Sequence, residues 1–198
     1  MRLKHLLAVV ALTVSIVSAP AFAQNLVANG SFETGYFTGW TTGGNFTDTE
    51  VVTIGFGYEP EDGTYFAALG PVGSPGTLSQ TFSDQAGTPY TFIFYLAASG
   101  DYSSSFSAMW DGNTLLSLTD PSTPNRQWVQ YSFTETGTGH DSISFSFQDD
   151  PGYIALDNVI VSSTASSTGT TPEPSSLVLL GSGVLALGAR ARRKFRVE

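Results

Sequence analysis

The sequence predicts an all-β body, a sandwich of two antiparallel sheets, placed between an apolar segment at each end of the chain. Three observations support this fold class. Few segments between residues 24 and 162 have helical periodicity. Short runs rich in aromatic and β-branched residues recur there, and clusters of Gly, Pro, Asn, Asp and Ser separate them. About ten such runs without helices indicate two packed sheets.

The N-terminal segment, residues 1–23, has the features of a secretory signal peptide helix. Arg2 and Lys4 supply a positive start, Leu6 to Val17 is apolar, and an A-x-A cleavage site ends at Ala23. We therefore expect export, cleavage by signal peptidase and a mature chain that begins near Gln24.

The runs expected to form strands follow one another through the body. In chain order they are Leu26–Asn29, Tyr65–Leu69, Thr77–Phe82, Tyr90–Leu96, Phe106–Trp110, Thr114–Leu118, the segments around 129–134 and 142–147, and Ile154–Val161. The nearly continuous apolar run of Tyr90–Leu96 favours a strand buried on both faces. Residues 111–113, Asp-Gly-Asn, are typical of a hairpin turn.

Two of these strands have a clear alternation that defines an inner face. Apolar residues alternate with polar ones in each, and a slip by one residue would turn the whole apolar set toward solvent. The expected inner residues are Val129, Tyr131 and Phe133 in one strand, and Ile143, Phe145 and Phe147 in the other.

The C-terminal segment, residues 172–198, follows a flexible Ser/Thr/Gly linker at 163–171. Pro172, Glu173 and Pro174 precede an apolar run from about Ser175 to Ala189. A helix of that length spans roughly 22 Å, less than the roughly 30 Å hydrocarbon core of a membrane. A membrane stop that stays in the cytoplasm is expected behind it, because Lys and Arg resist translocation. Its residues are Arg190, Arg192, Arg193, Lys194 and Arg196.

Together these C-terminal features resemble the PEP-CTERM sorting signal of exported bacterial proteins. The resemblance implies that an exosortase recognises and processes the tail while it is transiently held in the inner membrane. The protein would then reach the cell surface or the extracellular biofilm matrix. The alternative is a plain single-span anchor that is never cut.

Charge and cysteine content exclude several classes of function. Only Arg126 remains as a basic residue between 24 and 171, against fifteen Asp and Glu residues, so this part has a formal charge of −14. Nucleic acids and anionic headgroups are bound by Lys and Arg, so we expect no nucleic acid partner. The chain has no cysteine, which excludes disulfides, thiolate catalysis and Cys-ligated zinc.

Both ends of the body resemble jelly-roll carbohydrate-binding modules and related galactose-binding-like domains. The opening stretch Asn25–Glu33, followed by Gly39 and Trp40, carries the resemblance together with the closing strand Ala155–Val161. The resemblance implies a jelly-roll topology for residues 24–162 and a polysaccharide as the ligand.

The same resemblance implies a structural calcium ion where the first and last strands meet. Its ligands would be Glu33, Asp157 and backbone carbonyls from the region of Asn29 to Ser31. Ca²⁺ takes six to eight oxygens, many of them from the backbone, so two carboxylates can supply its charged part. The alternative is that both acids are hydrogen-bonded to backbone N–H groups.

Aromatic side chains are the candidate sugar-binding groups, because sugar-binding modules stack Trp or Tyr faces on pyranose rings. Trp110 and Trp128 stand at strand ends, and Tyr153 lies in a loop, as do Tyr58 and Tyr102. Each of these rings could equally serve packing. Trp40 is expected in the core.

We expect no enzymatic activity. The body has one histidine, His140, in a Gly/Thr/Asp turn, and the chain has no G-x-S-x-G nucleophile elbow. The sequence thus favours an exported surface protein with a non-catalytic polysaccharide-binding body. The alternatives are a structural matrix protein without a small ligand and a glycan-active hydrolase.

Overall fold

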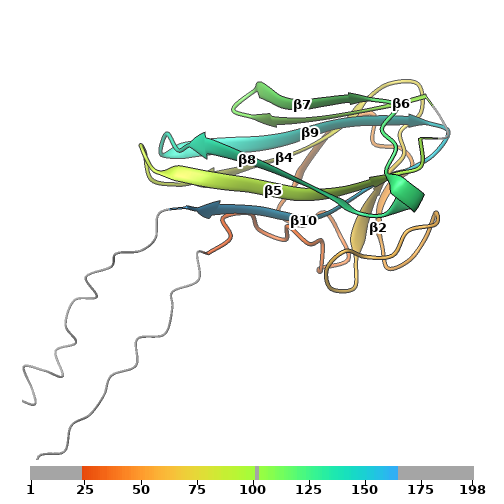
Figure 1. Cartoon of the computed structure of the whole chain (residues 1–198), viewed down its shortest axis with the longest axis horizontal. Coiled ribbons are helices and arrows are strands. Elements are labelled where there is room, and N and C mark those ends of the chain that lie inside the picture. Colours follow the sequence, from red (N-terminus) through yellow and green to blue (C-terminus); the bar gives the residue numbers. More distant parts are fainter. Residues whose placement is uncertain (1–23, 101–102, 165–198) are drawn as a thin grey trace, which may run out of the picture. The chain divides into compact units, whose positions relative to one another are not determined.

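The computed structural model describes residues 24–100 and 103–164, and these form the two-sheet antiparallel sandwich that the sequence predicts (Figure 1). The predicted signal peptide, most of the linker and the sorting segment lie outside the described residues.

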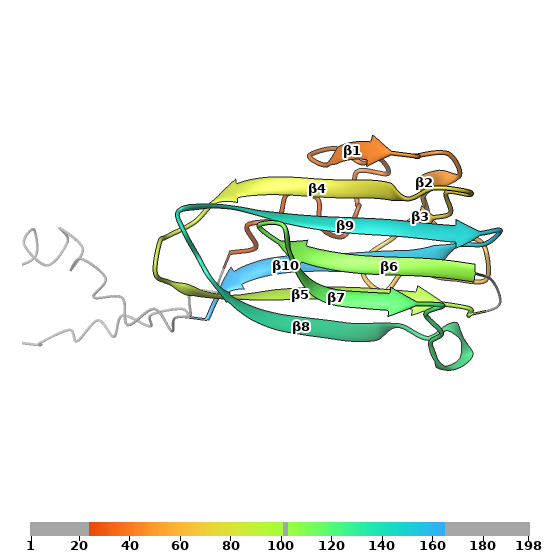
Figure 2. The same cartoon turned by 90° about the horizontal axis from the view of Figure 1, so that it is seen from above.

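The strands form two five-stranded sheets with a jelly-roll topology, and the chain passes repeatedly from one sheet to the other (Figure 2). The first sheet has the order β1-β4-β9-β6-β7 and the second the order β2-β3-β10-β5-β8. The elements are β1 (Thr41–Gly44), β2 (Thr49–Val52), β3 (Phe66–Leu69), β4 (Gly76–Ser83), β5 (Pro89–Ala98), β6 (Ser103–Trp110), β7 (Asn113–Thr119), a 3₁₀ turn η1 (Pro124–Arg126), β8 (Val129–Thr136), β9 (His140–Asp150) and β10 (Ile154–Ser163).

Most predicted strands are present, with three differences. Leu26–Asn29 is not a strand, because residues 28–31 turn away after the Leu26 N–H donates to the Val161 carbonyl oxygen at 2.8 Å. β1 and β2 were not predicted, since each is four residues long and only partly buried. β5 alternates between buried and half-buried residues over most of its length, so it is not buried on both faces throughout.

Aromatic residues fill the space between the sheets. Phe145 in β9 lies at the centre, where its ring centroid is 5.2 Å from that of Phe94 and 5.7 Å from that of Phe106. Trp40 is also in this core, as expected, and stacks on Phe32 at 5.7 Å. The predicted inner residues of β9 belong to this core, and Tyr131 and Phe133 of β8 pack against it, whereas Val129 is not part of it.

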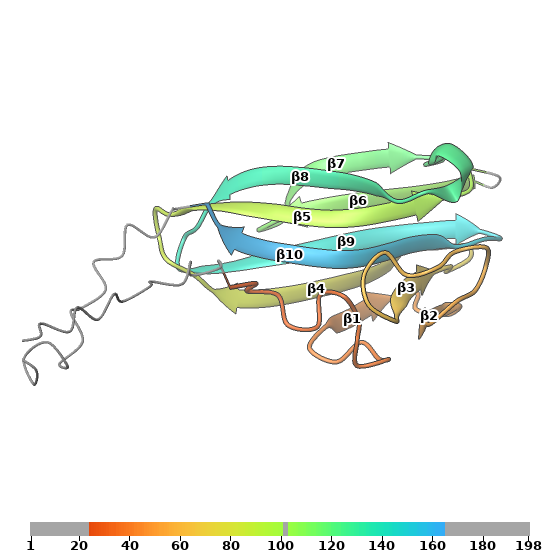
Figure 3. The ribbon, with the colours of Figure 1, turned by 60° about the horizontal axis from the view of Figure 1, so that its bottom comes forward.

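The second sheet also packs on its outer face, at one end. Ala68, Ala155 and Ala97 are direct neighbours across β3, β10 and β5, and all three are fully buried. Successive residues of a strand point to opposite faces, so this row lies opposite the core residues Ala67, Leu96 and Leu156. The loop 53–65 covers the row: Tyr58 packs on it and is itself buried (Figure 3).

Candidate functional site

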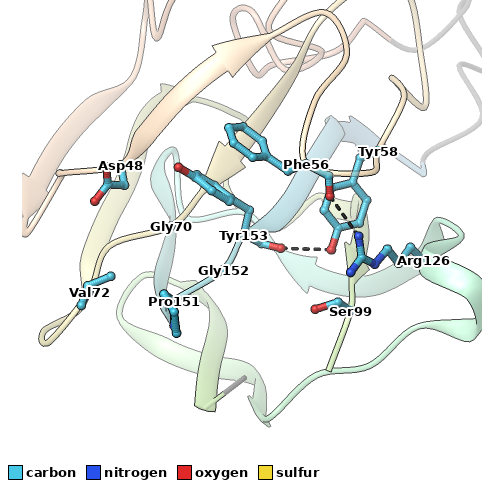
Figure 4. Close-up of a pocket in the computed structure, with 10 residues that line it drawn as sticks. All are labelled: Asp48, Phe56, Tyr58, Gly70, Val72, Ser99, Arg126, Pro151, Gly152 and Tyr153. Atoms are coloured by element: carbon cyan, nitrogen blue, oxygen red, sulfur yellow. Dashed lines mark hydrogen bonds between the residues drawn. The ribbon is translucent and has the colours of Figure 1, made fainter. Parts of the chain in front are cut away.

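A hollow opens where loop 53–65 meets the turns that enter and leave the second sheet (Figure 4). Its volume is about 340 Å³, within the range of small-ligand pockets. We call it the first hollow. Its lining comes from the turn before β2, from the loop, from the turn after β3, from the residue after β5, from η1 and from the turn before β10: Asp48, Phe56, Tyr58, Gly70, Val72, Ser99, Arg126, Pro151, Gly152 and Tyr153.

An aromatic pair forms one side of the first hollow. The rings of Phe56 and Tyr153 are stacked, with centroids 3.6 Å apart and planes inclined by 20°. Phe56 is 39% exposed, so the outer ring of the pair presents apolar surface to solvent. Gly70 lies beneath, where a Cβ atom would come within 2.7 Å of the Tyr153 ring, so the pair requires glycine there.

Arg126 forms the opposite side of the hollow. Its Nη1 donates to the Phe56 carbonyl oxygen at 3.1 Å, and its guanidinium lies 5.8 Å from the centroid of the Tyr58 ring. The Tyr58 hydroxyl donates to the Tyr153 carbonyl oxygen at 3.0 Å. Gly57 permits this approach, since a Cβ atom there would meet Arg126 Nη1 at 2.4 Å. These contacts hold the guanidinium at a defined place.

A second hollow lies on the other side of Arg126 and shares Tyr58 and Arg126 with the first. Its volume is about 820 Å³, and it includes Ile54, Glu59, Gln127 and Trp128. Trp128 packs edge-on against Phe66 at 6.0 Å and donates its Nε1–H to the Glu59 carbonyl oxygen at 3.0 Å. The indole thereby ties the loop to the start of β8.

The backbone of this region is in an unusual conformation. Asp48, Phe56 and Arg126 all line the first hollow and all have a positive φ, between 53° and 56°. A bulky residue such as Phe is rare in this region of backbone space, and such residues gather at functional sites. Phe32, which is fully buried in the core, has nearly the same φ, so this conformation does not by itself mark a functional residue.

The two hollows carry few charges. Arg126 is the only Lys or Arg among residues 24–164 and lines both hollows, with Asp48 in the lining of the first and Glu59 in that of the second. Burial raises the pKa of Tyr58, although Arg126 opposes the rise. Burial, and then the charges of Asp48 and Glu50, raise the pKa of Tyr153. Both phenols therefore stay protonated and can donate hydrogen bonds.

Of the predicted aromatic residues, Tyr153, Trp128 and Tyr58 line the hollows, whereas Trp110 does not. Tyr153 lines the first hollow and Trp128 the second, on either side of Arg126. Trp110 is only 3% exposed, because it packs against Phe82 and Phe92 inside the sandwich. This position corrects the expectation for Trp110, whose ring has no open face for a sugar.

Sequence analysis missed Phe56 and Arg126 as site residues. Phe56 stands between two glycines, Gly55 and Gly57, and Arg126 is the lone cation of the body after a Pro-Asn turn. Both features are visible in the sequence, but neither indicates by itself that the two residues are in contact. Tyr58, considered as an exposed loop residue, is in fact 4% exposed.

Glu33 and Asp157, the predicted calcium ligands, hold neighbouring parts of loop 53–65. Glu33 Oε1 accepts the backbone N–H groups of Thr64 and Tyr65, each at 2.8 Å. Asp157 Oδ2 accepts those of Glu61 at 2.8 Å and Asp62 at 3.1 Å. We call these two residues the carboxylate clamp.

The position of Asp157 follows from an irregularity in β10. The pairing of β10 with β5 shifts between Asp157 and Ile160, and Asn158 there has a φ of 47°. A bulge of this kind redirects side chains. It leaves Asp157 fully buried, with Oδ1 accepting the Asn158 N–H at 2.7 Å.

Asn29, the third predicted calcium ligand, makes hydrogen bonds within its own turn and to Trp40. Its side-chain amide donates to the carbonyl oxygens of Tyr36 and Thr38, and its own carbonyl oxygen accepts the Trp40 indole N–H at 3.1 Å. Within residues 24–100 and 103–164, no three His, Cys, Asp or Glu side chains are grouped to hold a metal. A calcium ion here would depend on Glu33, Asp157 and backbone or water oxygens.

The predicted sorting residues lie outside the described residues: Pro172, Glu173, Pro174, Arg190, Arg192, Arg193, Lys194 and Arg196. In the part of the chain that the structure describes, no helix has the length and apolar character needed to cross a membrane.

Comparison with known families and sequences identifies the C-terminal segment. Residues 170–194 match the PEP-CTERM protein-sorting motif, which agrees with the resemblance seen in the sequence. A search of curated protein sequences found none that matches this chain.

Comparison with solved structures identifies the fold of the body. TmCBM61 in complex with β-1,4-galactotriose has a TM-score of 0.58 and 20% identity, over 70% of this chain and 98% of that one. A cleaved adhesin domain of Lys-gingipain from Porphyromonas gingivalis has a TM-score of 0.53 and 18% identity, over 68% and 96%. The CBM22-1 xylan-binding domain of Paenibacillus barcinonensis Xyn10C has a TM-score of 0.50 and 15% identity, over 74% and 97%. At these identities the likeness establishes the jelly-roll fold alone.

The buried Asp157 predicts a dependence of stability on pH in metal-free protein. Burial raises its pKa from 3.8 to about 7, although three backbone N–H groups lower it in part. The folded state therefore holds a proton that the unfolded state releases between about pH 4 and pH 7. The free energy of unfolding should fall as pH rises across this window, by up to about 4 kcal/mol from this group.

Chemical denaturation at pH 5 and pH 8 in the presence of EGTA measures this effect. Asp157→Asn removes the titrating group and should flatten most of the difference between the two pH values. An equally steep fall in the variant would show that other groups cause it.

Proposed function

We propose that this chain is an exported, non-catalytic carbohydrate-binding protein, sorted through its C-terminal motif by an exosortase. The tail would be held transiently in the inner membrane, and the body would then act at the cell surface or in the extracellular matrix. The matched motif at residues 170–194 supports the export and sorting.

The stacked pair of Phe56 and Tyr153 beside Arg126 is the observation that carries carbohydrate binding. A pyranose offers an apolar ring face and a rim of hydroxyl groups. The exposed face of Phe56 suits the ring face. Arg126 supplies N–H donors for hydroxyl groups, and Asp48 and the Tyr58 hydroxyl oxygen supply acceptors.

The structural neighbours give this proposal its ligand class. The name of TmCBM61 places it in complex with β-1,4-galactotriose, and CBM22-1 is named as a xylan-binding domain. Both share the fold of this body, so a polysaccharide is the ligand we infer for the two hollows.

The distribution of carboxylates favours binding over hydrolysis. Glycosidases place a pair of carboxyl groups about the scissile bond, roughly 5 to 9.5 Å apart. Among the described residues that line them, Asp48 is the one carboxylate of the first hollow and Glu59 that of the second. His140 begins β9, at the end of the sandwich opposite the hollows.

The last described residues of the body lie at the end of β10 away from the hollows. The chain leaves the body at Thr164, whose N–H donates to the Pro89 carbonyl oxygen at 3.0 Å. Tyr153 lies before the other end of β10, a ten-residue strand that spans roughly 30 Å. A body held through its C-terminal side can therefore still present the hollows to a ligand.

Phe56→Ala should weaken glycan binding at least tenfold, because it removes the exposed ring of the stacked pair. A tenfold loss corresponds to about 1.4 kcal/mol, the scale of one aromatic contact. Affinity electrophoresis in gels that contain neutral polysaccharides measures the change. Tyr36→Ala is the matched control, since Tyr36 is 75% exposed and lines neither hollow.

An equal loss of glycan affinity in the Tyr36→Ala and Phe56→Ala variants would contradict a binding site at the first hollow. Retention of no neutral or acidic glycan by the unmodified protein would instead favour the structural matrix role without a small ligand.

Exosortase processing predicts a shortened C-terminus on the surface-located protein. Mass spectrometry of the mature chain should find it without Glu198 and the basic cluster, because the apolar segment is cut from the body. Recovery of Glu198 on protein isolated from the cell surface would indicate a permanent anchor instead.

We also propose that a calcium ion binds at the carboxylate clamp. Glu33 and Asp157 fit as its charged ligands, and Asn29 does not, because its oxygen atoms serve its own turn. When bound, the ion would neutralise the buried charge of Asp157 and strengthen the hold on loop 53–65.

Calcium should raise the thermal midpoint of unfolding by several degrees, and EGTA should reverse the rise. The effect should be larger at pH 8 than at pH 5, because calcium requires the ionised form of Asp157. Differential scanning calorimetry with magnesium as the control ion measures it. A thermal midpoint at pH 8 that calcium does not change would indicate that the carboxylate clamp binds backbone N–H groups and no calcium.

A further inference from the structure

The two hollows carry the same kinds of group on either side of Arg126. The first hollow offers the Phe56–Tyr153 pair and the carboxylate of Asp48, and the second offers Trp128 and Glu59. Tyr58 and Arg126 line both. A repeated set of groups suits a ligand that is itself a repeat.

Their sizes allow both hollows to be occupied at once. Their volumes are about 340 and 820 Å³, each comparable with pockets that enclose a small organic ligand. The Phe56 carbonyl oxygen fixes the Arg126 guanidinium at their shared wall. A planar guanidinium carries five N–H donors in a rigid fork, so one side chain can serve ligand groups on both sides.

Charge indicates which sugars fit. Each hollow is lined by one carboxylate and by the shared guanidinium, so neither has an excess of positive charge. The surrounding body carries −14 formal charges, and charges within about 8 Å of each other are incompletely screened at physiological salt. An acidic polymer would meet repulsion beyond Arg126, whereas an uncharged one would not.

We propose that the two hollows are adjacent subsites for one stretch of an uncharged polysaccharide, with at least one sugar unit on each side of Arg126. This inference rests on the proposed carbohydrate binding and adds the length and charge of the ligand. Phe56 and Tyr153 form the stacking surface of the first subsite, and Trp128 forms that of the second. Arg126 lies in the shared wall between the two units.

Isothermal titration calorimetry on the full chain tests the proposal with xylo-, gluco- and galacto-oligosaccharides of one to four units. In the series that binds, the affinity should rise at least tenfold between one unit and three. Phe56→Ala and Trp128→Ala should each remove most of this gain in affinity, because each variant keeps only one working subsite. Tyr36→Ala should keep it.

Trp128 packs against Phe66, so loss of folding must be separated from loss of a subsite. The exposed Gln127 lines the second hollow, and Gln127→Ala tests that hollow without disturbing the packing. We expect it to lower the affinity for three units twofold to fivefold and to leave binding of one unit unchanged.

The outcomes distinguish this inference from the proposed function. Equal affinity for one unit and for longer chains would overturn the paired subsites but leave carbohydrate binding in place. Tighter binding of oligogalacturonate than of any neutral series would overturn the assignment to uncharged sugars. Failure of every oligosaccharide and polysaccharide to bind would overturn the proposed function itself.

Discussion

The attachment of loop 53–65 to two carboxylates is the constraint on which the site depends. Glu33 and Asp157 together accept four backbone N–H groups from residues 61–65 of this loop. The half of the loop before them supplies Phe56 and Tyr58 to the hollows. One oxygen of each carboxyl group accepts two of these backbone N–H groups, so the clamp can hold a segment that has little regular structure of its own.

The second sheet is shaped to receive this loop. The alanines at 68, 97 and 155 are small enough for the Tyr58 ring to lie on the outer face, where larger residues would hold it away. Tyr58, Arg126 and Trp128 then tie the loop back to the turns around it through main-chain carbonyl oxygens. Because these acceptors belong to the backbone, the contacts fix the position of the loop as well as of the side chains.

The strand pattern was largely predictable, and its failures have local causes. β8 and β9 were found because alternation over several residues reports a half-buried strand. β1 and β2 were missed because four partly buried residues give too short a pattern. For Trp110 the sequence left packing and exposure open, because it has the parity of Phe106 but precedes a polar turn, and only the packing of Phe82 and Phe92 around it decides.

The sequence by itself determined the two-sheet class, the sorting motif, the absence of disulfides and the shortage of cations, because each is written in contiguous residues or in composition. Only the tertiary structure determined which residues come together to form the candidate site. Phe56 and Arg126 are 70 positions apart, and Tyr58 and Tyr153 are 95 apart, yet each pair shares a hydrogen bond. Such long-range contacts depend on the path that the loops take over the folded sheet, and no local periodicity of the sequence predicts that path.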